Sequence, residues 1–533
     1  YVLMDEKDFF GFALLATEKD FAGKTIKLGA DIKLNDGKAS KWNKEAPINK
    51  WISIGSKTLP FAGTFDGQMH TISGVYVKTT SDPCGLFGVT TQTATIKRLK
   101  LINSYFESDT GSAGSIVARG VGIFDTIYSD AIVINNSGCI GGMIGYVTEN
   151  KESTVKMTNC WFDGRVTNTS NETGKRMTGG LMGFVVIKVD VSNCLNTGTI
   201  DVRNYTVPND PKSEHVQPYA GGLFGYVYPN SKTTITDCMS TGKILVSDAV
   251  TSAAGSILGY SSGTTKISNT YATKESCKNT TRGNIEGDVI VYEEAQLKGY
   301  GGYQWTGLDF NKYWAVVLDD TSVLKSFAKS VLSLANVERK VDISWYNTNA
   351  KYVLYDAADL RGFALLSKTN TFKGKTVKLA NDIVLNSGNA DEWRKTAPET
   401  EWMSIGTVDT RFAGTFDGQK HTISGVYMNT DEKYTGFFSG TADEAVVKNF
   451  RLTNSYFYST QEELGSIVGN ARGKFDAVYS NAIVESSNNV AGGLIGSTSY
   501  DGGVKITNCW FDGEVTNVGK AASYYGGILA RAY

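Results

Sequence analysis

The chain contains few cysteines, no excess of positive or negative charge and no long apolar runs. Seven cysteines in 533 residues are too sparse for a disulfide scaffold. No apolar stretch approaches the length of a membrane span. Lysine and arginine total 53 against 54 aspartates and glutamates, which gives a formal net charge of −1. Without a basic run or stripe, the composition argues against a nucleic-acid partner, while a near-neutral surface permits self-association.

The abundant feature is self-similarity at long range. The stretch YVLMDEKDFFGFALL at Tyr1 returns as YVLYDAADLRGFALL at Tyr352. FAGTFDGQMHTISGVY at Phe61 returns as FAGTFDGQKHTISGVY at Phe412, and NCWFDG also occurs twice. A chain built by duplicating a structural unit serves reach, spacing or display more often than a single catalytic event.

A shorter repeat lies inside the first copy. Six glycine-rich blocks follow one another at about 25 to 45 residues, a spacing typical of solenoids. They are GLFG (85–88), AGSIV (113–117), GGMIGYV (141–147), GGLMGFV (179–185), GGLFGYV (221–227) and AGSILGY (254–260). Between them, stretches such as VKMTNCWFDGRV (155–166) carry apolar residues at alternate positions and end in turn residues. The pattern predicts an all-β fold, a right-handed parallel β-helix in two tandem copies.

A stack of coils exposes apolar rungs at its ends, so caps are expected. Short helices near residues 5–17 and 356–368 have capping and amphipathic signals, and each precedes a strand pair. We therefore expect a first unit over residues 1–285, a terminating segment and connector over 286–350, and a second unit over 351–533. The second copy stops at a mid-solenoid rung, which predicts that the chain is part of a longer polypeptide.

These motifs carry a resemblance to a known family. The G-G-L-x-G blocks resemble the GLUG motif. The run KLGADIKLN, W-x-S-I-G, FAGTFDGQxHTISGV and NCWFDG is similar to β-helical repeat regions of large bacterial surface proteins, including adhesin-like proteins and the non-catalytic part of IgA-protease-type peptidases. The resemblance implies secretion, attachment to a cell envelope and a role in adhesion or surface architecture. The zinc-peptidase signature H-E-x-x-H is not matched.

The cysteines recur at one place in successive units. Cys160, Cys194, Cys238 and Cys509 would lie in one ladder, each preceded by an asparagine or aspartate. We expect buried free thiols, because parallel Cβ vectors suit a disulfide poorly and no second ligand lies at metal spacing. The preceding residues are expected to form a hydrogen-bonded corner ladder; they are Asn159, Asn193, Asp237 and Asn508.

Two patterns raise the question of catalysis. Asp66 and His70, with Asp417 and His421 in the second copy, place a carboxylate four residues from an imidazole, as an acid/base pair would. Asp-Gly is however a turn signature, and the whole string is repeated, which favours a fold-defining corner. Polysaccharide-cleaving β-helices need clustered carboxylates on one face, and no ladder of Asp or Glu recurs at a fixed offset.

Binding is predicted in the loops that interrupt the repeat. Insertions at residues 168–177 and 204–219 are expected to project from one side of the solenoid, either as ligand contacts or as tolerated extensions. The candidate binding residues are Asn204, Tyr205, His215, Tyr219, Tyr226 and Tyr228. Six tryptophans are expected to anchor the core or the caps; they are Trp42, Trp51, Trp161, Trp393, Trp402 and Trp510.

The sequence thus favours a non-catalytic bacterial cell-surface protein, located outside the cell. It predicts a β-helical stalk or filament segment that displays loops, with no catalytic residue, cofactor or metal. The expected partners are a host or bacterial glycan, a surface protein or further copies of the chain. The alternative is a carbohydrate-active β-helix enzyme of the polysaccharide lyase or glycoside hydrolase type.

Overall fold

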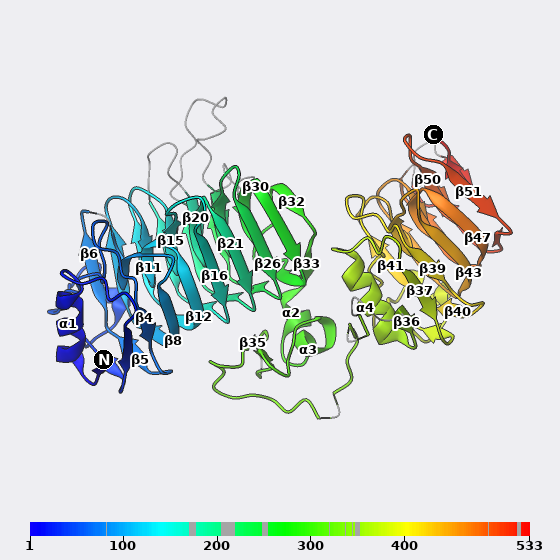
Figure 1. Cartoon of the computed structure of the whole chain (residues 1–533). Coiled ribbons are helices and arrows are strands. Elements are labelled where there is room, and N and C mark those ends of the chain that lie inside the picture. The colour runs from blue at the N-terminus through cyan, green and yellow to red at the C-terminus, as the bar shows by residue number, and fades with distance from the viewer. Residues whose placement is uncertain are drawn as a thin grey trace. The chain divides into compact units, whose positions relative to one another are not determined.

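The structure is a computed structural model, and the chain forms an all-β parallel β-solenoid (Figure 1). The structure describes residues 1–81, 83–169, 177–203, 219–247, 254–318, 320–335, 337–343, 345–346, 352–488, 490–519 and 524–533. The chain divides into two compact units. Unit 1 is Tyr1–Tyr303 with Leu308–Ala335, and unit 2 is Gln304–Gly307 with Asn336–Tyr533.

The largest sheet of unit 1 holds three sets of parallel strands. The first set is β1 (Val2–Leu3), β2 (Thr25–Leu28), β4 (Thr64–Asp66), β8 (Thr95–Ile102), β12 (Gly122–Ser129), β16 (Thr154–Thr158), β21 (Lys188–Ser192), β26 (Lys232–Thr236), β30 (Leu258–Ser268) and β32 (Gly283–Glu286). The second set is β3 (Ile32–Lys33), β5 (Thr71–Ser73), β17 (Trp161–Phe162), β22 (Leu195–Asn196), β27 (Met239–Ser240), β31 (Thr270–Thr273) and β33 (Val289–Tyr292). The third set is β7 (Phe87–Thr90), β11 (Val117–Gly120), β15 (Ile144–Val147), β20 (Met182–Val185) and β25 (Phe224–Val227).

Two smaller parallel sheets complete the walls of unit 1. One contains β6 (Tyr76–Thr79), β9 (Tyr105–Ser108), β13 (Ile132–Asn135), β18 (Arg165–Asn168), β23 (Thr199–Val202) and β28 (Ile244–Val246). The other contains β10 (Ala113–Gly114), β14 (Ile140–Gly141), β19 (Met177–Gly179), β24 (Tyr219–Gly221) and β29 (Ala254–Gly255). Each strand pairs with its counterpart in the next coil, as a solenoid requires.

Unit 2 is built of four parallel sheets. The first contains β36 (Tyr352–Leu354), β37 (Thr376–Leu379), β38 (Ile383–Val384), β39 (Thr415–Asp417), β40 (Thr422–Ser424), β43 (Val446–Thr453), β47 (Gly473–Ser480), β51 (Val504–Thr507) and β52 (Trp510–Phe511). The second contains β41 (Tyr427–Thr430), β44 (Tyr456–Ser459), β48 (Ile483–Ser486) and β53 (Glu514–Asn517). The third contains β42 (Phe438–Gly440), β46 (Val468–Ala471), β50 (Ile495–Thr498) and β55 (Leu529–Arg531), and the fourth β45 (Leu464–Gly465), β49 (Val490–Gly492) and β54 (Tyr524–Gly526).

The core of each unit is a set of inward-facing ladders. In unit 1, strand register places Phe65, Ile96, Phe124, Met157, Val191, Ile235 and Ile267 directly over one another. All seven side chains are at most 2% exposed. Each contributes about 1.5 to 3 kcal/mol of burial free energy, so like residues at like positions hold successive coils together. The predicted stacking of alternate apolar residues is confirmed.

Left-handed residues turn the chain at one corner of successive coils. Asn159, Asn193, Asp237 and Asn269 have φ between 44° and 55°. Asparagine and aspartate tolerate this backbone conformation better than other residues with a Cβ. The Asn159 Nδ2 donates to Asp125 Oδ1 at 2.9 Å, which links neighbouring coils. Asn508 has φ 53° and donates to Asp476 Oδ1 at 2.9 Å, so the predicted corner conformation is confirmed at all four positions and side-chain bonding at Asn159, Asp237 and Asn508.

Two helices lie against the first aromatic rungs of their units. Helix α1 (Glu6–Leu15) begins after Asp5, whose side chain accepts from the Asp8 backbone N–H. Its Phe9 stacks on Trp51 at 4.4 Å between ring centroids. Helix α4 (Ala357–Ser367) follows Asp356 in the same way, and its Phe363 stacks on Phe416 at 5.9 Å.

The other helices are short. They are η1 (Ala39–Lys41), α2 (Glu294–Leu297), α3 (Gly301–Trp305) and η3 (Ala390–Arg394). Among the described residues, no helix is long and apolar enough to cross a membrane.

Residues 308–335 belong to unit 1 and include the antiparallel pair β34 (Trp314–Ala315) and β35 (Val323–Leu324). Phe327 contacts the ring of Tyr128 at 5.7 Å. Parallel pairing in unit 1 continues through β33, which ends at Tyr292. The segment thus folds back along earlier coils of its own unit.

Candidate functional site

The carboxylate and imidazole of the repeated F-D-G-Q-x-H string have separate partners. Asp66 accepts from Arg98 Nε at 2.9 Å, and the backbone N–H of Gln68 donates to it at 3.0 Å. Burial alone would raise the pKa of Asp66, but the hydrogen bonds from Arg98 and Gln68 outweigh it and the pKa is lowered. His70 Nδ1 lies 3.2 Å from Asp31 Oδ1.

Unit 2 repeats this separation. Asp417 accepts from Asn449 Nδ2 at 3.1 Å and lies 3.4 Å from Lys448 Nζ. His421 Nδ1 lies 3.1 Å from Asp382 Oδ1. Neither copy joins its Asp to its His, so the string forms a structural corner, as its turn signature predicts.

The cysteine column is buried. Cys160, Cys194 and Cys238 are free, fully buried thiols in three successive coils. The backbone N–H of Cys160 donates to Cys194 Sγ, and that of Cys194 to Cys238 Sγ, each at 3.4 Å. Burial raises the pKa of Cys194 and of Cys238. The prediction of buried free thiols is confirmed for these three, whereas Cys509 is partly exposed.

The surface feature that unites several predicted binding residues is an outward column of aromatic rings. Strand register places Tyr146, Phe184, Tyr226 and Tyr260 one above another on β15, β20, β25 and β30. The Tyr146 and Phe184 centroids lie 5.0 Å apart with planes at 6°, and Phe184 and Tyr226 lie 5.4 Å apart at 20°. Stacked rings at this spacing contribute about 0.5 to 1.5 kcal/mol per pair beyond burial.

An arginine lies at each end of the column. Arg119 Cζ is 5.0 Å from the Tyr146 centroid, and Arg282 Cζ is 5.9 Å from that of Tyr260. Guanidinium groups over aromatic faces are cation–π contacts that fix the terminal rings.

A further aromatic ring, that of Tyr219, packs against the column from the neighbouring sheet. Tyr219 stacks on Tyr226 and on Tyr260, each at 5.0 Å. Met177, Tyr219 and Tyr226 form a buried cluster on the outside of the solenoid, with Cys139 packed against it. Burial raises the pKa of Tyr226, whose hydroxyl lies 2.9 Å from Ser262 Oγ. We call these residues, with the column, the aromatic face.

Tyr228 is the open part of the aromatic face. It is 46% exposed and meets Phe184 at 5.8 Å and 77°, a T-shaped contact. Both faces of Phe184 are already stacked, on Tyr146 and Tyr226, so Phe184 meets Tyr228 through its edge. Tyr228 is therefore the most exposed ring of the aromatic face, whereas Tyr219 and Tyr226 are buried.

The inserted segments start and end beside this face. Asn168 Nδ2 donates to Thr178 Oγ1 at 3.1 Å, which joins the two ends of the first insertion. Arg203 Nε donates to Asp201 Oδ1 at 3.0 Å just before the second insertion, and Tyr219 is the last residue of that insertion. The structure thus brings together the predicted Tyr219, Tyr226 and Tyr228. The predicted Asn204, Tyr205 and His215 lie outside the described residues.

Unit 2 has a different column at the matching position. There, register aligns Gly440, Asn470, Ser497 and Arg531 on β42, β46, β50 and β55. In unit 1, the corresponding column is Val89, Arg119, Tyr146 and Phe184, so Ser497 and Arg531 take the places of the first two rings. The fold therefore forms without aromatic rings at these positions.

Sequence reasoning missed Tyr146, Phe184 and Tyr260, although a signal for them was present. In GGMIGYV, GGLMGFV, GGLFGYV and AGSILGY, an aromatic residue follows the last glycine each time. The position alternates with inward residues, so its side chain points outward, and four recurrences predict an outward aromatic ladder.

Four of the six tryptophans are buried, Trp161 is half-buried on the outside of β17 against Tyr128, and Trp510 is exposed. Trp42, Trp51, Trp393 and Trp402 are at most 6% exposed, as expected for anchors. Trp510 is 63% exposed, and its prediction as a core anchor is wrong. Strand alternation explains the error, because Phe511 takes the inward position of β52 and leaves Trp510 outside, against Tyr479.

Comparison with known proteins gives limited likenesses. No family model matches the chain. A protein provisionally named a Gly-rich membrane protein, from Evansella cellulosilytica, is 34% identical over 85 residues, which are 16% of this chain. The chain spans 10% of that relative's length. A crystal structure provisionally named an immunoglobulin A1 protease, from Bacteroides ovatus, aligns with a TM-score of 0.43 and 18% identity over 62% of this chain and 93% of that one.

Proposed function

We propose that the chain is a non-catalytic structural and adhesive segment of a bacterial cell-surface protein, located outside the cell. In this proposal, two tandem right-handed β-helices, related to GLUG-motif repeats, form a stalk or filament segment. Helices α1 and α4 cap the first coil of each. The partner is a host or bacterial glycan, a surface protein or another copy of the chain.

The observation that carries this proposal is the aromatic face. It places a half-exposed ring, Tyr228, beside the ends of two inserted segments on a stiff, ladder-packed wall. Aromatic rings with one free face are suited to stacking on the apolar face of a sugar ring or on a protein side chain. The separate partners of Asp66 and His70 support the non-catalytic part of the proposal.

The test is to incubate the whole chain with an immobilised glycan panel and to score both retention and product release. We expect retention without products. Tyr228→Ala should reduce retention about fivefold or more, the usual minimum for an anchoring aromatic. Tyr300→Ala is the matched control, because Tyr300 is 38% exposed and lies outside the aromatic face. Release of cleaved glycan would favour the carbohydrate-active enzyme instead.

A further inference from the structure

Two matched loops of the chain carry opposite charge. Residues 36–50 follow β3 in unit 1, and residues 387–401 follow β38 in unit 2. The first has four lysines against two carboxylates, net +2, and the second has four carboxylates against an arginine and a lysine, net −2. All of these charged residues are exposed. We call them the basic loop and the acidic loop.

The two loops have the same frame. Trp42 and Trp393 are buried and meet Tyr76 and Tyr427 edge to face at 6.1 and 6.2 Å. The backbone N–H groups of Ala39 and Ala390 donate to the side chains of Asn103 and Asn454, each at 2.9 Å. The charge reversal therefore sits on two copies of one fixed conformation.

Neighbouring charges sharpen the contrast. In the acidic loop, Arg394 is occupied by Glu485 and Glu514, at 2.8 and 2.9 Å. In the basic loop, Asp36 is paired with Lys33, outside the loop. The pairing of Asp36 thus leaves the basic loop more strongly positive. In the acidic loop, Glu399 is in turn paired with Lys340 at 3.3 Å, so Asp391, Glu392 and Glu401 supply its negative charge.

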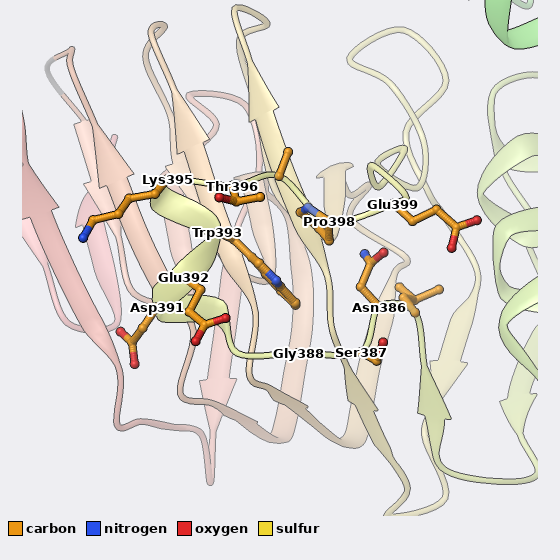
Figure 2. Close-up of a pocket in the computed structure, with 12 residues that line it drawn as sticks. Asn386, Ser387, Gly388, Asp391, Glu392, Trp393, Lys395, Thr396, Pro398 and Glu399 are labelled. Carbon is orange, nitrogen blue, oxygen red and sulfur yellow. The ribbon is translucent and has the colours of Figure 1, made fainter.

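The loops also differ in the side chains that they expose. Ile48, in the basic loop, is 95% exposed. The acidic loop encloses a hollow of about 690 Å³. Figure 2 shows Trp393 extending from η3 between residues 386–388 and 396–399, with Pro398 on the far side. Ile48 thus offers an exposed apolar side chain, and the hollow of the acidic loop has apolar lining at Trp393 and Pro398 among polar and charged residues.

We propose that the basic loop of one copy of the chain docks on the acidic loop of a second copy. Ile48 enters the hollow beside Trp393 and Pro398, while Lys41 and Lys44 face the carboxylates around it. Because each copy has one loop of each kind, the contact joins different surfaces and can propagate along a row of copies. The inference rests on the proposed function and names self-association as one of its modes.

The test measures the mass of the whole chain by analytical ultracentrifugation over a range of concentrations. We expect mass to rise with concentration at about 0.05 M salt and less so at 0.5 M, where charges further apart than a few ångströms are screened. Variant A, Lys41→Glu with Lys44→Glu, and variant B, Asp391→Lys with Glu392→Lys, should each associate about tenfold or more weakly.

Mixing the two variants is the decisive arm. Variant A keeps the acidic loop and variant B the basic loop, so an equimolar mixture should recover association that neither shows alone. The control for variant A is Lys7→Glu with Lys19→Glu, the same charge change on exposed residues elsewhere. Ile48→Asp should weaken association by itself, without changing the circular dichroism spectrum.

Three outcomes would overturn the proposal. They are a monomer at every concentration, association unchanged in variants A and B, and a salt-dependent sedimentation change without a change of mass, which indicates contact within one chain. None of these affects glycan retention by Tyr228, so failure here is separable from failure of the proposed function.

Discussion

Single residues at the corners of the coils combine backbone strain with a compensating side-chain bond. Arg98 has φ 52°, a left-handed conformation that costs a residue with a Cβ about 1 to 2 kcal/mol. Its guanidinium binds Asp66 in the preceding coil, at 2.9 Å from Nε and 2.5 Å from Nη2. The charged hydrogen bonds offset the strain, so an arginine occupies a corner that asparagine takes in later coils.

Asp66→Asn should destabilise unit 1 by about 1 to 2 kcal/mol at pH 7, because Arg98 loses its charged partner. The pKa of Asp66 is lowered in the folded protein. The stability that the charged Asp66 contributes is therefore complete above the ordinary pKa near 3.8. This stability is lost as the pH falls through the lowered pKa of the folded protein. Urea unfolding at pH 7 and pH 3 measures this, and the difference between wild type and variant should shrink at pH 3.

Asp36→Asn is the control for this prediction, since the Asp36 side chain is 91% exposed and should change stability little at either pH. An equal loss for Asp66→Asn at both pH values would show that the carboxylate acts through packing and not through its charge.

At the scale of single elements, helices α1 and α4 are held against their units by a few aromatic contacts. Phe9 of α1 is fully buried and stacks on Trp51, while Leu14 on the same helix is 64% exposed. Within the part of the chain that the structure describes, strand β1 pairs with β2 alone, and we expect the first coil to depend on the helix for part of its packing. The helix therefore controls the stability of β1 and β2 more than that of later coils.

Phe9→Ala should cost about 3 to 5 kcal/mol, the usual loss for a buried phenylalanine. Leu14→Ala, on the exposed side of α1, should change stability by less than about 0.5 kcal/mol. Hydrogen exchange of the β1 and β2 amides measures the local effect and should accelerate only in Phe9→Ala. Equal acceleration in the two variants would mean that α1 does not hold the first coil.

The sequence allowed local features of these elements to be predicted, because they follow from the chain's own periodicity. Alternation indicated the inward position of Phe65, and the recurring N-C pair indicated the burial of Cys194. Leu195 and Met239 point outward and are nevertheless fully buried. Their burial depends on distant segments of the chain, which no local period encodes.

The aromatic face was predictable only in part for the same reason. Tyr226 lies in a repeated block and Tyr228 follows the end of β25, so their closeness could be predicted from the sequence. The stacking of Tyr219 on Tyr260 joins two sheets and required the corner geometry. Either Trp510 or Phe511 could have faced the core, because adjacent residues of a strand point to opposite sides. The sequence alone did not show which of the two is exposed.

At the scale of the whole molecule, the chain has two separate cores. The largest cluster of unit 1 ends at Ala272, and that of unit 2 begins at Tyr352. In a solenoid each coil contacts mainly its neighbours, so stability is close to a sum of local terms. Two such cores in one chain should therefore unfold as separate transitions, and a single free energy of unfolding does not describe the molecule.

Substitutions of Phe65 and Phe416 test whether the two units unfold separately. Both side chains are fully buried at the same place in their units, and they stack on helices α1 and α4, respectively. Phe65→Ala should lower the stability of unit 1 by about 3 to 5 kcal/mol and leave unit 2 unchanged, and Phe416→Ala should do the reverse. Limited proteolysis along a urea series, with fragments assigned by mass spectrometry, follows each unit separately. If either substitution shifted both transitions equally, the two cores would act as one, because independent units transmit no loss of packing to each other.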